Sequence, residues 1–290
     1  MLHWTIGDVR VTRIVEIEST GGSRFILPDA TPEACVPMRW MQPHFCSPEG
    51  KLRMSVHALV IEVKQATGTR RIVVDTCIGN DKPRAIPAWN HLQTRFLDDL
   101  AAAGYPRESI DTVLCTHLHV DHVGWNTMWS GEHWVPTFPN ARYLVHAREW
   151  AYWQAEAEGE HRQIMNDSVQ PIVDAGLMDE VATDHRVCAQ VQLEPTPGHT
   201  PGHVSVRITS GGQQALITGD FMHHPCQMQR LDWGSTADFD PAAAKATRER
   251  MLARLAADQT LVIGTHFATP TAGRVKPHAE GGYWLDVALG

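Results

Sequence analysis

The chain lacks several features that would place it in common classes of protein. It has no run of Lys or Arg, and its 290 residues carry a net charge of −8, which argues against a nucleic-acid-binding surface. No apolar stretch approaches the roughly 20 residues that a membrane-spanning helix needs. Residues 1–8 contain neither the basic nor the apolar segment of a secretory signal. We therefore expect a cytoplasmic protein with neither membrane nor nucleic-acid partners.

Cysteine pairs at short spacing are also missing. The six cysteines form no Cys-x-x-Cys pair, and Cys77 and Cys115 lie at the ends of expected buried strands. In a chain of this length without a signal, reduced thiols are expected rather than a disulfide framework. With 290 residues, 43% of them hydrophobic, the chain is long enough to form a large hydrophobic core without disulfide bonds.

Histidine, by contrast, is abundant, with 17 residues that partly cluster. Residues 113–124 begin as an apolar run, expected to be a buried strand, and end in the pattern His-x-His-x-Asp-His. His117 and His119 can project to one side if the chain stays extended. The adjacent Asp121 and His122 must diverge, so this stretch can serve two neighbouring metal ions. Imidazole and carboxylate suit zinc, iron and related divalent ions; the alternative is four polar side chains in a surface loop.

Strands and helices are expected to alternate along the chain. Periodicity predicts helices at 91–103, 147–158 and 241–258, with Gly104 ending the first and Asp240 capping the third. Strands are predicted at 9–18, 56–63, 71–75, 110–116, 187–193, 203–209, 215–217 and 261–263, with turns around Thr67-Gly68-Thr69 and Gly211-Gly212. In 203–209, strict alternation predicts that Ser205 faces outward. Strands followed by a helix occur twice, which fits a pair of sheets with helices on both outer faces.

Two segments have little periodicity. Residues 19–50 contain five prolines and several apolar side chains, and we expect an ordered flap with an apolar face. Residues 125–170 hold five of the ten tryptophans. This tryptophan-rich insertion predicts either core or subunit packing, which leaves a homodimer open, or the wall of an apolar substrate pocket.

Further candidate ligands follow predicted strands, where a rigid scaffold can hold a polar group at a sheet edge. Asp75 ends the strand at 71–75, Asp220 follows the strand at 215–217, and His266 follows the strand at 261–263. His199 lies in a turn stiffened by Pro and Gly, just before the strand at 203–209.

The order His-x-His-x-Asp-His, lone His, lone Asp and last His resembles the metallo-β-lactamase superfamily of metal-dependent hydrolases over nearly the whole chain. The resemblance implies an α/β fold, a four-layer αβ/βα sandwich, here one domain over 1–290 with the metals at the top of two sheets. It also implies the ligands: His117, His119 and His199 for one metal, Asp121, His122 and His266 for the second, and Asp220 bridging both. Seven donors are too many for one tetrahedral ion.

Asp75 resembles the family's aspartate that orients a ligand histidine; a simple turn aspartate is the alternative. His57 and His203 are expected to be packed or exposed histidines outside the site. Two divalent ions, zinc first and iron, manganese or cobalt as options, would hold a shared hydroxide that attacks the substrate. Asp121 is expected to relay a proton to the leaving group. Substrate contacts are expected from His223, His224 and Trp125, and either of the two histidines could instead protonate the leaving oxygen.

The substrate class follows from departures within the family. Aspartate at position 220, where the zinc β-lactamases often have cysteine, favours lactonases, phosphotriesterase-like enzymes and glyoxalase II-type thioesterases. Arg248, Arg250 and Arg254 are expected on a solvated helix face rather than in a basic patch for glutathione. The chain has no room for the inserted domain of the family's nucleases.

We therefore expect a hydrolase of ester bonds, similar to N-acyl homoserine lactonases, acting on a small, neutral, partly apolar lactone or ester. An organophosphate or aryl ester hydrolase is the alternative. A glyoxalase II-type thioesterase, a β-lactamase and a flavodiiron-type redox domain are further options, although the last would carry an acidic residue in the first motif and a flavin domain. A non-catalytic binding protein with this fold is a further alternative, but such a protein would normally have lost some of the metal ligands, and all seven are present here.

Overall fold

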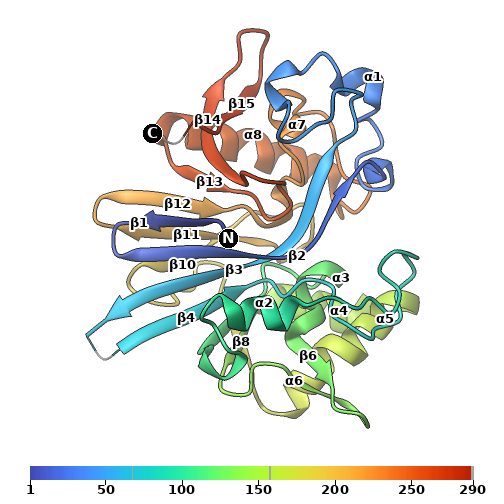
Figure 1. Cartoon of the computed structure of the whole chain (residues 1–290), viewed down its shortest axis with the longest axis vertical. Helices are drawn as coiled ribbons and strands as arrows, with labels where there is room; N and C mark the ends of the chain where they lie inside the picture. Colours follow the sequence, from blue (N-terminus) through green and yellow to red (C-terminus); the bar gives the residue numbers. More distant parts are fainter. Residues whose placement is uncertain (67, 157, 289–290) are drawn as a thin grey trace. The chain divides into compact units, whose positions relative to one another are not determined.

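The structure of the protein is a computed structural model that describes residues 1–66, 68–156 and 158–288. The chain divides into two compact units: unit 1, Met1–Ile17 with Val56–His185, and unit 2, Glu18–Ser55 with Arg186–Gly290. Each unit contains a mixed sheet and helices (Figure 1). A single domain over 1–290 stays a prediction. Thr67 of one expected turn, Ala157 of the second expected helix and the last two residues of the chain lie outside the described part.

Unit 1 is built on a seven-stranded sheet in the order β1-β2-β3-β4-β5-β8-β9. Strands β4, β5, β8 and β9 run parallel to one another, whereas β1–β2 and β3–β4 are antiparallel pairs. The strands are β1 (His3–Ile6), β2 (Val9–Thr20), β3 (Arg53–Gln65), β4 (Gly68–Val74), β5 (Thr112–Leu114), β8 (Arg142–His146) and β9 (Met178–Val181), with a separate hairpin of β6 (Thr127–Trp129) and β7 (Trp134–Pro136). The helices are α2 (Phe96–Ala102), α3 (Val120–Val123), α4 (Ala147–Glu156), α5 (Gly159–Ile164) and α6 (Gln170–Asp174), and a π-helical turn, Met165–Val169, joins α5 to α6.

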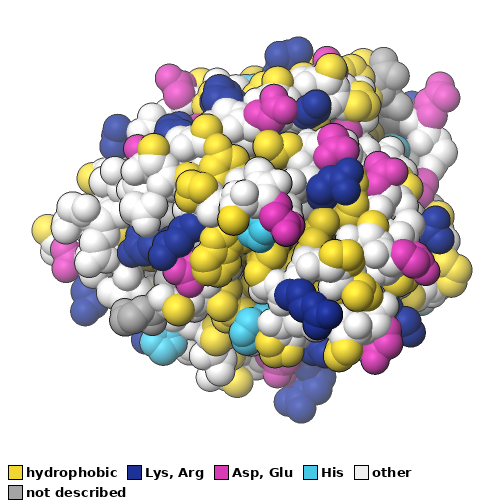
Figure 2. All heavy atoms as spheres, turned by 90° about the horizontal axis from the view of Figure 1, so that it is seen from above, with side chains coloured by type: hydrophobic (Ala, Val, Ile, Leu, Met, Phe, Trp, Pro, Cys, Tyr) yellow, Lys and Arg dark blue, Asp and Glu magenta, His cyan; other side chains and the backbone are white. Residues whose placement is uncertain are grey.

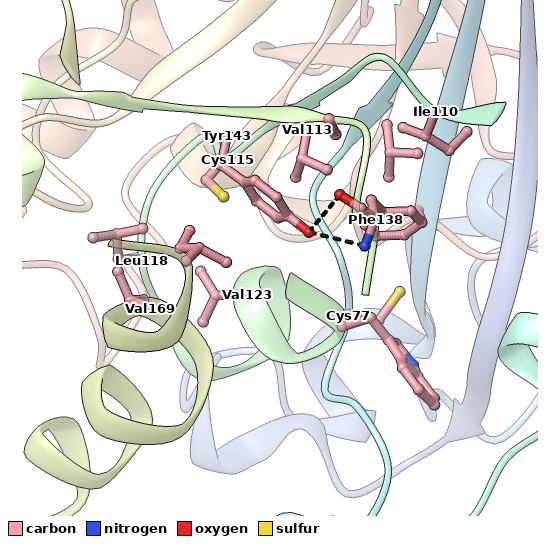
Figure 3. Packing of buried hydrophobic residues seen from close by; sticks show 14 of the residues in the cluster. Cys77, Ile110, Val113, Cys115, Leu118, Val123, Phe138, Tyr143 and Val169 are labelled. Carbon is pink, nitrogen blue, oxygen red and sulfur yellow. Dashed lines mark hydrogen bonds between the residues drawn. The ribbon is translucent and has the colours of Figure 1, made fainter. Parts of the chain in front are cut away.

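The core of unit 1 surrounds β5, whose three residues are all buried. A strand between parallel neighbours is covered on both faces and is therefore largely apolar; the polar residue of β5, Thr112, accepts a hydrogen bond from Arg70 at 3.1 Å. Val113 and Cys115 pack there with Phe138 and Tyr143 (Figure 3). The Tyr143 hydroxyl accepts a hydrogen bond from the Phe138 backbone N at 3.0 Å, so the one polar atom of this side chain is satisfied inside the core. The histidine motif thus begins at the end of a rigid, buried strand.

Unit 2 is built on a six-stranded sheet in the order β10-β11-β12-β13-β14-β15, in which only the β12–β13 pair is parallel. The strands are β10 (Val191–Pro195), β11 (Val204–Ser210), β12 (Gln213–Ile217), β13 (Leu261–Ile263), β14 (Ala272–Pro277) and β15 (Tyr283–Asp286). The helices are α1 (Pro32–Cys35), α7 (Cys226–Gln229) and α8 (Pro241–Asp258), and α8 lies against β14 (Figure 1). Short 3₁₀ turns occur in both units at Ser23–Phe25, Arg39–Met41, Arg107–Ser109, Gly124–Asn126 and Gly219–Phe221.

Most predicted elements are confirmed, and the third helix has the bounds and the cap that were expected. The Asp240 side chain accepts a hydrogen bond from the Ala243 backbone N at 3.0 Å, and Pro241 is the first helical residue. The predicted helix at 91–103 instead begins at Phe96. Asn80 binds both the backbone N and the backbone O of Thr94, which holds the preceding residues in a non-helical path. The predicted strand at 187–193 begins at Val191, because the backbone N of Val187 and of Cys188 bond back to the Val191 carbonyl in a tight turn.

Two expectations about exposure are wrong. Ser205 is buried, because its hydroxyl donates to the Thr218 carbonyl at 2.7 Å and so does not need water. Arg248 is also buried rather than on a solvated face. Its guanidinium donates hydrogen bonds to the backbone carbonyls of Phe221 and Leu231, and these bonds compensate for the loss of water around the buried charge. Arg250 is exposed and Arg254 is half-buried, as the surface face of α8 requires.

The two segments of low periodicity supply core rather than open apolar surface. In residues 19–50, Leu27, Met41 and Phe45 are buried in the core of unit 2, and Phe25 is exposed. In residues 125–170, the tryptophans at 125, 150 and 153 are buried in unit 1, while Trp129 is exposed on the β6–β7 hairpin. Core packing therefore accounts for three of the five tryptophans.

The surface has mixed charge on the face shown in Figure 2, where basic and acidic side chains alternate with hydrophobic ones. Such a face carries no extended field of one sign. Across the described residues, every helix is too short or too polar to traverse a lipid bilayer.

Candidate metal centre

In unit 1 the candidate residues follow two neighbouring parallel strands, β4 and β5, whose carboxyl ends lie at one edge of the sheet. Asp75 follows β4 and accepts hydrogen bonds from the Thr116 backbone N at 2.8 Å and from the Thr116 hydroxyl at 2.9 Å. The second Asp75 oxygen also lies 2.9 Å from His122 Nδ1. Since a carboxylate accepts, His122 Nδ1 carries the proton, and its Nε2 presents a lone pair.

The same reasoning fixes His117. The Thr116 hydroxyl donates to Asp75 and therefore accepts from His117 Nδ1, 3.1 Å away. The lone pair of His117 Nε2 then faces His119 Nδ1 at 3.1 Å, and His122 Nε2 lies 3.6 Å from an Asp121 oxygen. The four residues of the motif that were expected to bind metal thus lie together, and two of their imidazoles have a defined tautomer.

Sequence reasoning missed Glu149, which supports this motif from α4. Its buried carboxylate accepts hydrogen bonds from the Leu118 backbone N at 3.1 Å and from Trp153 Nε1 at 2.7 Å. Trp153 in turn packs edge-on against the ring of His119. The only signal in the sequence is an acidic residue four positions before a tryptophan on an expected helix, which is too common to be diagnostic.

In unit 2 the candidate residues gather around Asp220, which lies just after β12. Nε2 of His199 is 3.6 Å from Asp220 Oδ2, and Nε2 of His266 is 3.2 Å from either oxygen. Nε2 of His223 is also 3.2 Å from Oδ2. His199, Asp220 and His223 together form a group of buried donors that is compact enough to hold one ion.

The outer nitrogens of two of these imidazoles face acceptors. His199 Nδ1 lies 3.0 Å from Asp238 Oδ1, and His266 Nδ1 lies 3.0 Å from the Ser55 carbonyl. Both Nδ1 atoms therefore donate, and a neutral ring turns its Nε2 lone pair towards the Asp220 carboxylate. Lone pairs facing a carboxylate repel it unless a cation lies between them. Donors bound tetrahedrally at 2.0–2.2 Å from zinc are about 3.4 Å apart, which matches these separations, so the residues fit a divalent metal.

Two glycines allow the ligand loops of unit 2 to adopt their positions. Gly198 precedes His199 at φ +130°, and a Cβ there would lie 2.2 Å from the Ala244 backbone N. Gly219 precedes Asp220 at φ +55°, and a Cβ there would lie 2.6 Å from His203 Nε2. Only glycine combines these conformations with such close approaches.

His203, which was left out of the ligand set, is buried and supports Asp220. Its Nδ1 donates to the Thr196 carbonyl at 2.9 Å, and its Nε2 accepts from the Asp220 backbone N at 2.7 Å. Both ring nitrogens therefore serve the fold. His57, also left out, is buried in unit 1.

The three expected substrate contacts differ in their surroundings. His224 donates from Nε2 to the Phe45 carbonyl and accepts at Nδ1 from the Cys226 backbone N, and burial lowers its pKa to about 4. Trp125 is buried, stacks on Phe96 and donates from Nε1 to Glu16. The polar atoms of both side chains are thus occupied within their own unit, which argues against substrate contact. His223 alone lies next to a candidate ligand.

Asp238 is a second residue that sequence reasoning missed. Its side chain is buried beside His199, and its carboxylate also accepts a hydrogen bond from the Ser235 backbone N at 3.0 Å. Nothing in the spacing between 199 and 238 connects the two residues, because they lie on separate loops that only the folded chain brings together.

A family model described as the metallo-beta-lactamase superfamily matches residues 53–266. The chain belongs to this superfamily. Among curated relatives, the N-acyl homoserine lactonase of Bacillus thuringiensis subsp. kurstaki is 28% identical over 160 residues, which cover 55% of this chain and 56% of the relative. A protein of Mycobacterium tuberculosis (strain ATCC 25618 / H37Rv) described as a probable metallo-hydrolase is 26% identical over 189 residues, 58% of this chain and 57% of the relative. The chain thus spans only a little over half the length of the curated relatives that it matches.

Solved structures agree with the family assignment. A hydrolase of the beta-lactamase superfamily, AbOPH, superposes with a TM-score of 0.78 at 23% identity and covers 99% of this chain and 97% of its own. The dizinc quorum-quenching lactonase AidC superposes with a TM-score of 0.79 at 19% identity and covers 100% and 98%. At these identities the likeness concerns the fold, and the expected metallo-β-lactamase fold is confirmed.

Proposed function

We propose that this member of the metallo-β-lactamase superfamily is a metal-dependent hydrolase that opens N-acyl homoserine lactones or related small esters with an apolar tail. The observation that carries the proposal is the pair of imidazoles, His199 and His266, whose protonated Nδ1 atoms leave Nε2 lone pairs aimed at the Asp220 carboxylate. The similarity to N-acyl homoserine lactonases in the matched part of the chain supports the choice of substrate.

The proposed ligands follow the superfamily pattern on the residues of this chain. We assign His117, His119 and His199 to one divalent ion, Asp121, His122 and His266 to a second, and Asp220 to both. Within unit 1, the hydrogen bonds of His117 and His122 to Thr116 and Asp75 support this assignment, because they turn both Nε2 atoms away from the sheet residues. Zinc suits this donor set, as do iron, manganese and cobalt.

Bound divalent ions would polarise the lactone carbonyl and would lower the pKa of a bound water towards about 7. The residues of the chain contribute orientation and proton transfer. Asp75 and Asp238 hold the rings of His122 and His199, so that the ligands need no rearrangement before the reaction. To Asp121, whose side chain is 15% exposed, we assign the transfer of a proton from the attacking water to the leaving alkoxide when the ring opens.

A panel of purified-enzyme assays tests the choice of substrate. The substrates are acyl homoserine lactones of several chain lengths, an aryl ester, a phosphotriester and a β-lactam, with metal content measured on the same sample. We expect lactone opening to exceed every other kcat/KM by about a hundredfold. A phosphotriester or an aryl ester as the best substrate would replace the proposal with the organophosphate or aryl ester alternative.

The ligand assignment is tested by His119→Ala, with His133→Ala as the matched control. His133 is an exposed histidine of the same unit, next to the β6–β7 hairpin. We expect His119→Ala to lose bound metal and activity together, while His133→Ala keeps both. Full metal content and full activity in His119→Ala would refute the assignment.

A further inference from the structure

His223 lies among the donors of unit 2 without belonging to the seven-residue set. Its Nε2 is 3.2 Å from Asp220 Oδ2, the same separation that His266 Nε2 has from that atom. The rings of His223 and His266 are parallel within 7°, with centroids 6.0 Å apart. Two histidines from different loops thus present the same nitrogen to the same carboxylate.

The other buried histidines of this region behave differently. His203 and His224 each use both ring nitrogens to bind the backbone of the fold. His223 does not: among the described residues its buried Nδ1 has no hydrogen-bond partner, and its Nε2 faces only donors of the candidate site. A side chain that is 3% exposed and has no role in the hydrogen-bonding of the fold points to a ligand.

The backbone of His223 is nevertheless held firmly. Its N donates to Gln227 Oε1 at 2.7 Å, and Gln227 Nε2 donates to the Trp233 carbonyl at 3.0 Å. Gln227 is fully buried. This anchor fixes the position from which the imidazole extends, as preorganised ligand sites require.

We propose that His223 Nε2 is an additional metal ligand, which binds the cation held by His199 and Asp220. The inference rests on the proposed function, since it needs a metal to bind. It changes the expected role of His223 from substrate contact to metal binding. Together with the ligands already assigned, this gives that cation five donors, His117, His119, His199, Asp220 and His223, while His266 stays with the second ion.

Cobalt(II) reports the coordination directly, through its visible absorption. We would load wild type, His223→Asn and the control His278→Asn, and measure bound cobalt, its affinity by chelator competition and the spectrum. His278 is a half-buried histidine of the same unit that lies outside the candidate site. We expect His223→Asn to lower the affinity for one of the bound ions by about 10- to 100-fold or more and to change the cobalt spectrum. The control His278→Asn should match the wild type in both.

A second variant keeps the test informative if His223→Asn folds poorly. His223→Cys places a thiolate at the same position, and a thiolate bound to cobalt adds a charge-transfer absorption that is absent from the wild type. The seven assigned ligands are imidazoles and carboxylates, and the six native cysteines are the same in wild type and variant, so a band that only the variant shows would come from position 223.

The outcomes separate this inference from the proposed function. If wild type binds no stoichiometric metal, the proposed function fails. If wild type binds metal but His223→Asn keeps the affinity and spectrum and His223→Cys adds no band, His223 is not a ligand. In that second case a lowered kcat for substrates with poor leaving groups would return His223 to its expected place beside the substrate.

Discussion

The two units present histidines in contrasting ways. In unit 1 the candidate ligands come from six consecutive positions, and their supports, Asp75 and Thr116, lie within two residues of the ends of two adjacent parallel strands. In unit 2 the ligands come from three loops along the chain, and their supports are a loop carboxylate, Asp238, and a backbone carbonyl, that of Ser55. A contiguous motif thus uses the sheet as its frame, whereas a dispersed one depends on loop contacts that form only when the chain is folded.

The two supporting carboxylates also differ in how many donors depend on them. Asp75 accepts from the Thr116 backbone N, the Thr116 hydroxyl and His122 Nδ1. Asp238 accepts from His199 Nδ1 and the Ser235 backbone N. Removing an acceptor leaves buried donors unsatisfied, at about 1–3 kcal/mol each, so the comparison can be tested by removing each carboxylate.

Asp75→Ala should have the largest effect. It leaves three donors at the end of β4 and β5 without an acceptor, and we expect the free energy of unfolding to fall by about 4 kcal/mol. Denaturant unfolding measures this loss, with Asp179→Ala, an exposed ion-pair residue of the same unit, as the control. A loss no greater than that of the control would show that the sheet edge does not depend on this carboxylate.

Asp238→Ala should cost less stability and act mainly on metal binding. Two donors lose their acceptor, so we expect about 2 kcal/mol, together with a 10- to 100-fold loss of metal affinity, about the effect of removing a partner of a ligand histidine. Chelator competition measures the affinity, and Asp238→Asn should recover part of it through the remaining carbonyl oxygen. Asp232→Ala, which removes an exposed ion pair with Arg230, should leave the affinity unchanged.

Both units bury cationic side chains, and two of these, Lys82 in unit 1 and Arg248 in unit 2, differ chemically. In unit 1, Lys82 Nζ donates to the Thr127 hydroxyl at 2.7 Å, lies 3.6 Å from an oxygen of Asp167 and lies over the Trp134 ring. Burial lowers the pKa of Lys82 to about 7. In unit 2, Arg248 donates to backbone carbonyls, and although burial lowers its pKa too, a guanidinium stays charged at every pH at which the protein folds.

The smallest expected effect is therefore a difference in pH dependence. Unfolded Lys82 keeps its proton up to about pH 10.5, whereas in the folded chain it begins to lose it near pH 7. The unfolded state then binds more protons, so stability rises with pH above 7, by about 1 kcal/mol between pH 7 and 8. Denaturant unfolding at pH 7 and at pH 8 should show this rise in the free energy of unfolding for wild type and for Arg248→Met. Lys82→Met should not show it. Equal slopes in wild type and Lys82→Met would contradict it.

The motif of unit 1, the strands that carry most candidate ligands and the cap of α8 can all be predicted from the amino-acid sequence. These depend on neighbours along the chain: alternating burial, a residue just after a strand, or a Pro after an Asp. The start of α2 and the burial of Ser205 could not be predicted in this way, because Asn80 and the Thr218 carbonyl decide them from distant positions.

Only the folded chain shows which of the neighbouring histidines of unit 2 have a ring nitrogen available to a metal. In the sequence the superfamily pattern singles out His199, but nothing in their spacing tells whether His203, His223 or His224 could also bind a metal. They differ because the folded chain places an acceptor beside Nδ1 of His199, satisfies both nitrogens of His203 and His224, and leaves His223 facing Asp220. A histidine can bind a cation only through a nitrogen that the fold does not already use, and that depends on contacts between residues far apart in the chain.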